Sequence, residues 1–117
     1  MDGNAQVITP LLVETKIKEM LEIMFKLSPE HIAGIDRMAN LFDQIGIDSL
    51  EAFDAIVTLH DLLEEEIPRD IDPTTIGTLE KLGIYLVEKY PQEKIKQFFE
   101  SDIAAQLAER AGAEDEL

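Results

Sequence analysis

The chain has 117 residues, of which 45% are hydrophobic and only 6% aromatic, and this indicates a single domain with a mainly aliphatic core. A formal net charge of −15 disfavours nucleic acid and anionic membranes, whose phosphates would repel the surface, and favours partners with basic patches. The lack of cysteine excludes disulfides, thiol nucleophiles and thiolate metal sites, so any thiol would have to arrive on a prosthetic group. Because the sequence shows neither a membrane-span-length apolar run nor a signal peptide, we expect a cytoplasmic protein.

Sparse proline and glycine, and the lack of an alternating Val/Thr-rich run, predict an all-α class. Thr9-Pro10 is a typical helix start. A helix of about four turns is then predicted, ending near Leu27, from apolar residues at helical spacing: Leu11, Val13, Ile17, Met20, Leu21, Met24 and Phe25. Ser28-Pro29 could start one more short turn, and the region through Asn40 is otherwise expected to be a long connection.

The stretch from Leu41 to Glu51 is predicted to be a loop that opens an amphipathic helix from Ser49 to about Glu65. Asp48 is placed as an N-cap, and Glu51 completes the spacing of a capping box. Ser49 would lie in the first turn, where the positive end of the helix dipole favours a phosphate ester. At 100° per residue, the inward stripe is Ala52, Ile56, Leu59 and Leu63 with Phe53 beside it, and the opposite polar stripe is Glu51, Asp54, Thr58, Asp61 and Glu65. Leu62 falls nearer the polar stripe than the core.

The remainder of the chain predicts a short turn and further helices. Ile67-Pro68 ends the preceding helix, Asp72 to Ile76 is typical of one short helical turn, and Thr78 should cap a helix from Leu79 to Tyr90. Gly83 inside that helix could permit a close helix contact. A further amphipathic pattern covers residues 92–111, with a possible break at 101–102, an expected stop at Gly112 and an acidic tail from 113; its apolar residues are Ile95, Phe98, Phe99, Ile103 and Leu107.

Three segments, Asn40-Leu41-Phe42, Ile45-Gly46-Ile47-Asp48-Ser49-Leu50 and Ile67-Pro68, together resemble an acyl carrier protein over roughly residues 9–90. The resemblance implies a four-helix bundle of three longer helices and one short one in residues 1–91, followed by an extension helix and acidic tail in residues 92–117. It implies a non-enzymatic protein whose Ser49 carries 4'-phosphopantetheine. The thiol of that arm would present acyl groups as thioesters to enzymes of fatty-acid or related lipid or polyketide biosynthesis.

The resemblance also implies roles for the residues around Ser49. Asp48 would help to hold the magnesium ion used by the phosphopantetheinyl transferase. Partner enzymes with basic patches, such as acyl-transferring, condensing or ligase enzymes, would dock on Leu50, Glu51, Asp54, Val57 and Asp61. An acyl pocket would take its residues from the inward stripe and its neighbours: Phe53, Ile56, Leu59, Leu63, Ile71, Ile76 and Leu79. His60 and Leu62 stand where relatives commonly carry glutamates, which leaves the choice of partner open.

The apolar stripe of residues 95–107 is too extensive for a helix left alone in water, so the extension is expected to dock on the bundle, on a surface that could include Leu62. A second copy of the chain or a dedicated enzyme is the alternative partner for this stripe, although a monomer is expected.

Other functions fit less well. A serine hydrolase would need Gly-x-Ser-x-Gly around Ser49 and a histidine base, and neither His31 nor His60 is evidently placed for that role. The acidic residues lack the spacing of a calcium-binding EF-hand loop, and two histidines with no third ligand do not suggest zinc, so no metal site is predicted. Two alternatives stay open: an acidic helical interaction module that never carries the arm, and a carrier with aminoacyl or polyketide cargo.

Overall fold

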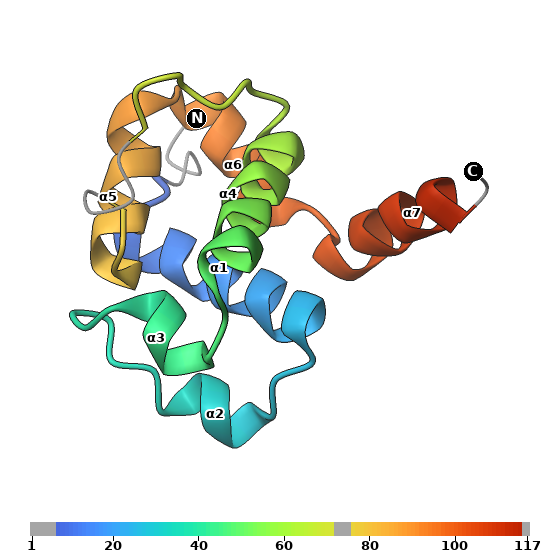
Figure 1. Cartoon of the computed structure of the whole chain (residues 1–117). Coiled ribbons are helices and arrows are strands. Elements are labelled where there is room, and N and C mark those ends of the chain that lie inside the picture. Colours follow the sequence, from blue (N-terminus) through green and yellow to red (C-terminus); the bar gives the residue numbers. More distant parts are fainter. Residues whose placement is uncertain (1–6, 72–75, 116–117) are drawn as a thin grey trace.

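The computed structural model describes residues 7–71 and 76–115, with side chains up to residue 110. Its regular structure in these ranges is helical, which confirms the predicted all-α class. The helices, shown in Figure 1, are α1 (Pro10–Phe25), α2 (Pro29–Ala33), α3 (Leu41–Ile45), α4 (Ser49–Leu63), α5 (Leu79–Lys89), α6 (Gln92–Glu100) and α7 (Ile103–Asp115). They pack into a helical bundle in which α1 lies against α4, α5, α6 and α7.

The helix starts follow the capping residues of the sequence. Thr9 caps α1 with Pro10 at the first helical position, and the Thr78 side chain accepts a hydrogen bond from the Lys81 N–H of α5 at 3.0 Å. Ser28 caps the short helix α2 in the same way, accepting from the His31 N–H at 3.1 Å. Local hydrogen bonding therefore fixes where these helices begin.

The stretch before Ser49 contains a helical turn where a loop was expected. Helix α3 is only five residues long, and Asn40 caps it by accepting from the Asp43 N–H at 2.9 Å. Gly46 ends it with φ of 73°, a left-handed conformation that glycine adopts without the steric cost of a Cβ. One turn is too short to show helical periodicity, which explains why the sequence pattern did not indicate it.

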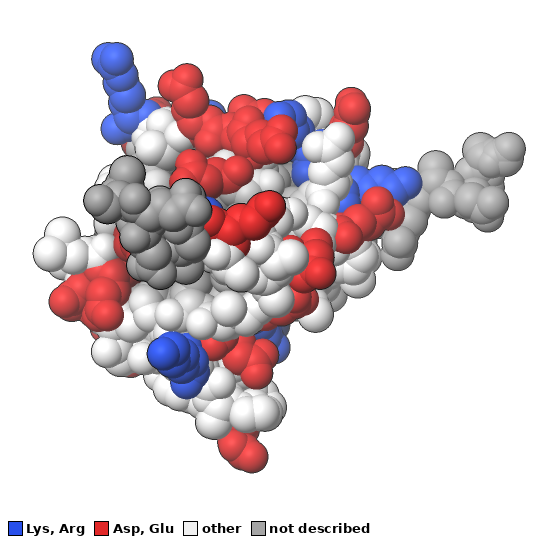
Figure 2. Space-filling view, turned by 90° about the vertical axis from the view of Figure 1, so that its right-hand side faces the viewer, with Lys and Arg blue, Asp and Glu red and all other residues white. Residues whose placement is uncertain are grey.

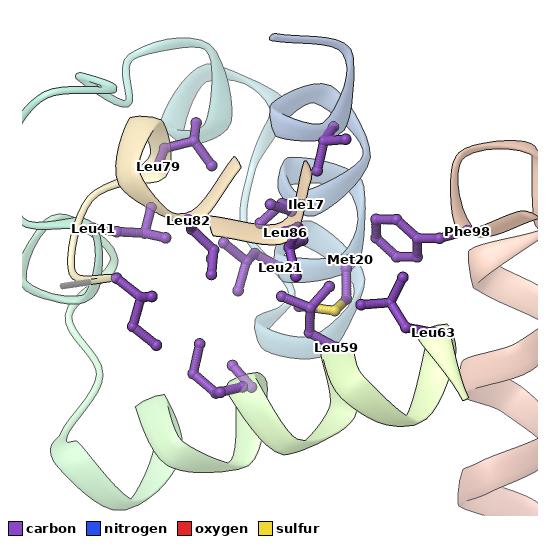
Figure 3. Close-up of a cluster of buried hydrophobic side chains, with 14 of the residues drawn as sticks. Ile17, Met20, Leu21, Leu41, Leu59, Leu63, Leu79, Leu82, Leu86 and Phe98 are labelled. Carbon is purple, nitrogen blue, oxygen red and sulfur yellow. The ribbon is translucent and has the colours of Figure 1, made fainter. Parts of the chain in front are cut away.

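The core is a single cluster of mainly aliphatic side chains that also includes the aromatic rings of Phe98 of α6 and Tyr90 (Figure 3 shows Phe98). Phe98 of α6 points toward Met20 of α1 and Leu63 of α4, and it is almost completely buried. Ile95 and Ile103 are also fully buried. The expected docking of the extension on the bundle is therefore observed for residues 95–103, whereas the chain division at residue 91 stays a prediction.

Helix α5 approaches α1 closely at Gly83. A Cβ added there would lie 2.8 Å from the backbone carbonyl oxygen of Pro10, closer than real Cβ contacts come. The absence of a side chain at this position therefore permits the close helix contact that the sequence suggested.

Two predictions for α4 and one for α7 need correction. Thr58 was assigned to the polar outer stripe, but it is only 1% exposed. Ala55, not Ala52, is the buried alanine of α4, because the inward face is rotated slightly from the expected one. Gly112 does not stop the last helix, since α7 continues to Asp115 and includes part of the expected acidic tail. Residues 72–75 of the predicted short turn lie outside the described residues.

Candidate functional site

Ser49 is the first residue of α4, and a complete capping box fixes its position. The Asp48 carboxylate accepts from the Glu51 N–H at 2.8 Å, and the Glu51 carboxylate accepts from the Asp48 N–H at 3.1 Å. Both predicted capping roles are thus confirmed. Ser49 is exposed, and it lies at the end of a 15-residue helix where the backbone dipole favours negative charge.

The segment leading to Ser49 is tied to the start of α5. Leu41 N–H donates to the carbonyl of Gly77 at 2.8 Å, beside an isolated antiparallel bridge between Asn40 and Thr78. Glu80 N–H donates to the carbonyl of Arg37 at 2.9 Å. These backbone bonds hold α3 and the residues just before α5 side by side, which brings Ile76 toward the N-terminus of α4.

A charged side-chain pair joins the same segment to α1. The guanidinium of Arg37 donates two hydrogen bonds to the carboxylate of Glu14 on α1, at 2.9 and 2.6 Å. Glu14 is only 4% exposed, so the pair satisfies a buried charge that would otherwise be costly. Arg37 also contacts Glu80 of α5 at 3.4 Å, and the ion pairs thus link the site's supporting loop to two long helices.

A cavity of about 330 Å³ opens beside Ser49, between α3 and the first two turns of α4. The volume is at the lower end of the range of about 300–1,000 Å³ typical of small-molecule sites. Polar groups at its margin come from Asn40, Asp43, Asp48 and Ser49. Its remaining lining is apolar and consists of Phe42, Ile47, Ala52, Phe53, Ile56, Ile71 and Ile76.

Four of the seven predicted pocket residues line this cavity: Phe53, Ile56, Ile71 and Ile76. The other three, Leu59, Leu63 and Leu79, do not line it, because their side chains are buried in the core (Figure 3). Helical periodicity distinguishes inward from outward positions but cannot separate a filled core from a cavity at one end of the same stripe.

Five further lining residues were not predicted as cavity residues from the sequence: Asn40, Phe42, Asp43, Ile47 and Ala52. Phe42 and Ile47 are apolar residues on either side of Gly46, within the segment that was expected to be a loop. Two apolar residues so close to a turn glycine were the signal in the sequence that this segment packs on the protein, and both are partly buried in the structure.

The predicted docking residues at the start of α4 are exposed, whereas the one near its end is ion-paired. Leu50 is 80% exposed, and Glu51 and Asp54 are exposed beside it, while Val57 is half-buried. Asp61 is instead ion-paired with Arg110 of α7. On the face of the molecule in Figure 2, acidic side chains cover more of the surface than basic ones.

His60 is a packing residue. It is 1% exposed, its Nδ1 lies 2.8 Å from the carbonyl of Ile56, and its Nε2 lies 3.1 Å from the hydroxyl of Tyr85. A carbonyl accepts only, so Nδ1 carries the hydrogen and Nε2 accepts from Tyr85. Burial lowers the pKa of His60 from 6.5, outweighing the hydrogen bond to Ile56, and burial raises the pKa of Tyr85 and of Tyr90.

Neither histidine is positioned as a base for Ser49. His60 is engaged with Ile56 and Tyr85, and the Nε2 of His31 lies 2.8 Å from the carbonyl of Gln44. The hydroxyl-bearing residue Ser49 is exposed, and both histidines of the chain are engaged elsewhere.

In the part of the chain that the structure describes, no three His, Cys, Asp or Glu side chains come together as a possible metal site. Over the same residues, no helix has both the length and the hydropathy that a membrane crossing requires.

Comparisons of this chain with protein-family models, with curated protein sequences and with solved structures give no match.

Proposed function

We propose that the protein is an acyl carrier protein in which Ser49 bears a 4'-phosphopantetheine arm. The observation that carries the proposal is the position of the Ser49 hydroxyl, which is exposed on the first turn of α4 and lies on the margin of an apolar cavity. A phosphate ester on this oxygen would lie at the positive end of the helix dipole. The bound arm would supply a thiol that holds an acyl group as a thioester.

The cavity gives the apolar part of such a cargo a place to bind. Ile56, Ile71 and Ile76 provide its aliphatic walls, and a hydrocarbon chain placed there would leave water. Phe53 is 56% exposed and also lines the cavity, so its ring is placed to narrow the entrance. Ser49 lies four residues before Phe53, about one helical turn away, which puts the attachment point close to this entrance.

The exposed start of α4 gives partner enzymes a surface to recognise. Leu50 projects an aliphatic side chain into solvent beside the carboxylates of Glu51 and Asp54. A partner with a basic patch would be steered to this surface by the net charge of −15. Asp48 would contribute its charge to the magnesium ion used by the transferase, in addition to its capping role.

The test is incubation of the protein with a broad-specificity phosphopantetheinyl transferase, coenzyme A and magnesium, followed by intact-mass measurement. We expect one phosphopantetheine to be added to the unaltered protein and none to Ser49→Ala. Ser28→Ala is the matched control, because Ser28 is also a serine at a helix start, and it should be modified normally. Modification that persists in Ser49→Ala would remove the basis of the proposal.

The second candidate is an acidic interaction module without an arm. The observation that favours it is the high exposure of Leu50 and Phe53, which together provide an apolar contact for a protein partner whether or not Ser49 is modified. If the unaltered protein keeps its unmodified mass after incubation with the transferase, this candidate is supported instead. Within the carrier class, an aminoacyl cargo stays an alternative to a fatty one.

A further inference from the structure

The last helix contacts the acidic face of α4 at its C-terminal half. Arg110 of α7 forms an ion pair with the carboxylate of Asp61, and its second terminal nitrogen lies 3.5 Å from the hydroxyl oxygen of Thr58. Thr58 lies on the same side of α4 as Asp61, three residues earlier, and is 1% exposed. Thr58 is therefore closed to solvent, and the chain's own arginine pairs with the carboxylate of Asp61, whose side chain stays 51% exposed.

The contact between α7 and α4 is open on one side. A groove of about 630 Å³ lies between the end of α4, the end of α6 and α7, and both members of the ion pair line it. Leu62 of α4 and Gln97, Ser101 and Gln106 of the extension also face it. The two helices therefore meet through side-chain tips and not through a closely packed apolar interface.

Few interactions hold α7 against α4, although α7 also contacts α1 and its Leu107 packs against the core. Ile103 at its start is fully buried, but residues 104–110 are exposed or only half-buried. The side chains of Arg110 and Asp61 are 34% and 51% exposed, and ion pairs with this much exposure contribute little and are screened by salt. In Figure 1 α7 leads away from the bundle toward the C-terminus. The helix can thus leave α4 while Phe98 and Ile103 remain in the core.

We propose that α7 is a displaceable cover of this face, and that Arg110 occupies the position at Asp61 that an arginine of a partner protein would otherwise take. Among the described residues, a partner meets no competing side chain at Glu51 and Asp54, whereas at Asp61 it competes with Arg110 for the carboxylate. Glu51 and Asp61 are ten residues apart, about 15 Å along a helix, so the partner is a segment with basic residues at that separation. The inference rests on the acidic face alone and not on modification of Ser49, so the two proposals can fail separately.

A peptide of six arginines is a suitable probe, because in extended form it spans about 20 Å. Its affinity is measured at low ionic strength for the full chain and for Arg110→Ala. Lys81→Ala is the matched control, since it removes one positive charge from the exposed side of α5. We expect Arg110→Ala to bind the peptide about two- to five-fold more tightly than Lys81→Ala does, the range that an exposed ion pair provides. Equal affinities of the two variants would show that Arg110 does not compete.

The same comparison in an Asp61→Asn background tests whether Asp61 is the contested group. There, Arg110→Ala should bind no more tightly than Lys81→Ala; an advantage that persists without the Asp61 charge overturns the proposal.

Amide hydrogen exchange on the unaltered chain tests whether the peptide displaces α7 from α4. Saturating peptide should accelerate exchange in residues 104–110 and leave residues 95–98 of α6 protected, because only α7 moves. If the peptide binds and residues 104–110 keep their protection, α7 is a fixed part of the surface and not a cover.

Discussion

Asp48 has two separable properties, a side chain that caps α4 and a negative charge next to Ser49. Its carboxylate accepts the Glu51 N–H at 2.8 Å, a bond that an asparagine side chain can also make. Asp48→Asn should therefore unfold at nearly the same urea concentration as the unaltered protein, while the transferase modifies it more slowly. Asp48→Ala should lose about 0.5–2 kcal/mol of stability. Normal modification of Asp48→Asn would mean that the charge has no part in the reaction.

We expect His60 to make the stability of the protein depend on pH. Burial lowers the pKa of His60 from 6.5, so His60 takes up a proton more readily in the unfolded chain than in the folded one. The neutral form is stable in the fold above about pH 6.5, and the free energy of unfolding should fall as pH decreases below that value. The groups around the ring that affect its charge are Asp61 and Glu65, which favour the proton, and Lys89, which opposes it.

The measurement is urea unfolding between about pH 7.5 and pH 5. His60→Gln should be less stable than the unaltered protein at the higher pH, because it loses the contacts with Ile56 and Tyr85, but its stability should fall less over this range. Parallel pH profiles for the two proteins would assign the dependence to other groups, such as the many carboxylates.

Capping residues allowed the ends of elements to be predicted from sequence, because a cap is a local interaction. Thr9, Asp48 and Thr78 all cap the helices expected of them. The burial of Thr58 and His60 could not be predicted in this way. It depends on Arg110 and on Tyr85, which lie 52 and 25 residues further along the chain. The cavity beside Ser49 likewise depends on α3, whose single turn has no periodicity.

Because α1 and α5 are in close contact at Gly83, a residue with a side chain should not fit at this position. Alanine is favoured over glycine inside a helix by about 1 kcal/mol, yet a Cβ at this position would lie 2.8 Å from the Pro10 carbonyl oxygen. We expect Gly83→Ala to destabilise the protein by about 1–3 kcal/mol. Gly34→Ala is the control, since its Cβ would lie 3.4 Å from the nearest oxygen, and its unfolding free energy should change by about 0.5 kcal/mol or less. A more stable Gly83→Ala in thermal unfolding would contradict the close contact.

Helix α6 is part of the core through one of its two adjacent phenylalanines. Phe98 is buried against α1 and α4, and Phe99 is only half-buried. Phe98→Ala should therefore lower the free energy of unfolding by about 3–5 kcal/mol. Phe99→Ala should cost clearly less, about 1 kcal/mol. Equal losses in chemical denaturation would mean that α6 does not pack in this orientation.

At the scale of the whole molecule, the net charge of −15 should govern encounters with basic partners. The transferase rate should fall as salt rises, because the screening length shortens from about 10 Å at 0.1 M to about 3 Å at 1 M. Asp54→Lys should slow the reaction more than Glu100→Lys does, although both remove the same charge from exposed positions, because only Asp54 lies on the docking face. Reversal of Asp61 is a poorer test, since it also breaks the contact with Arg110.

The most direct test of the carrier proposal is the site of modification in protein co-expressed with a broad-specificity phosphopantetheinyl transferase. Intact mass followed by fragmentation should show one phosphopantetheine, located on the peptide that contains Ser49, and the Ser49→Ala protein should keep its unmodified mass. An established carrier expressed in the same cells serves as the positive control. If that carrier is fully modified while this protein stays unmodified, or carries the group elsewhere, Ser49 is not an attachment site and the account of the α4 N-terminus is wrong.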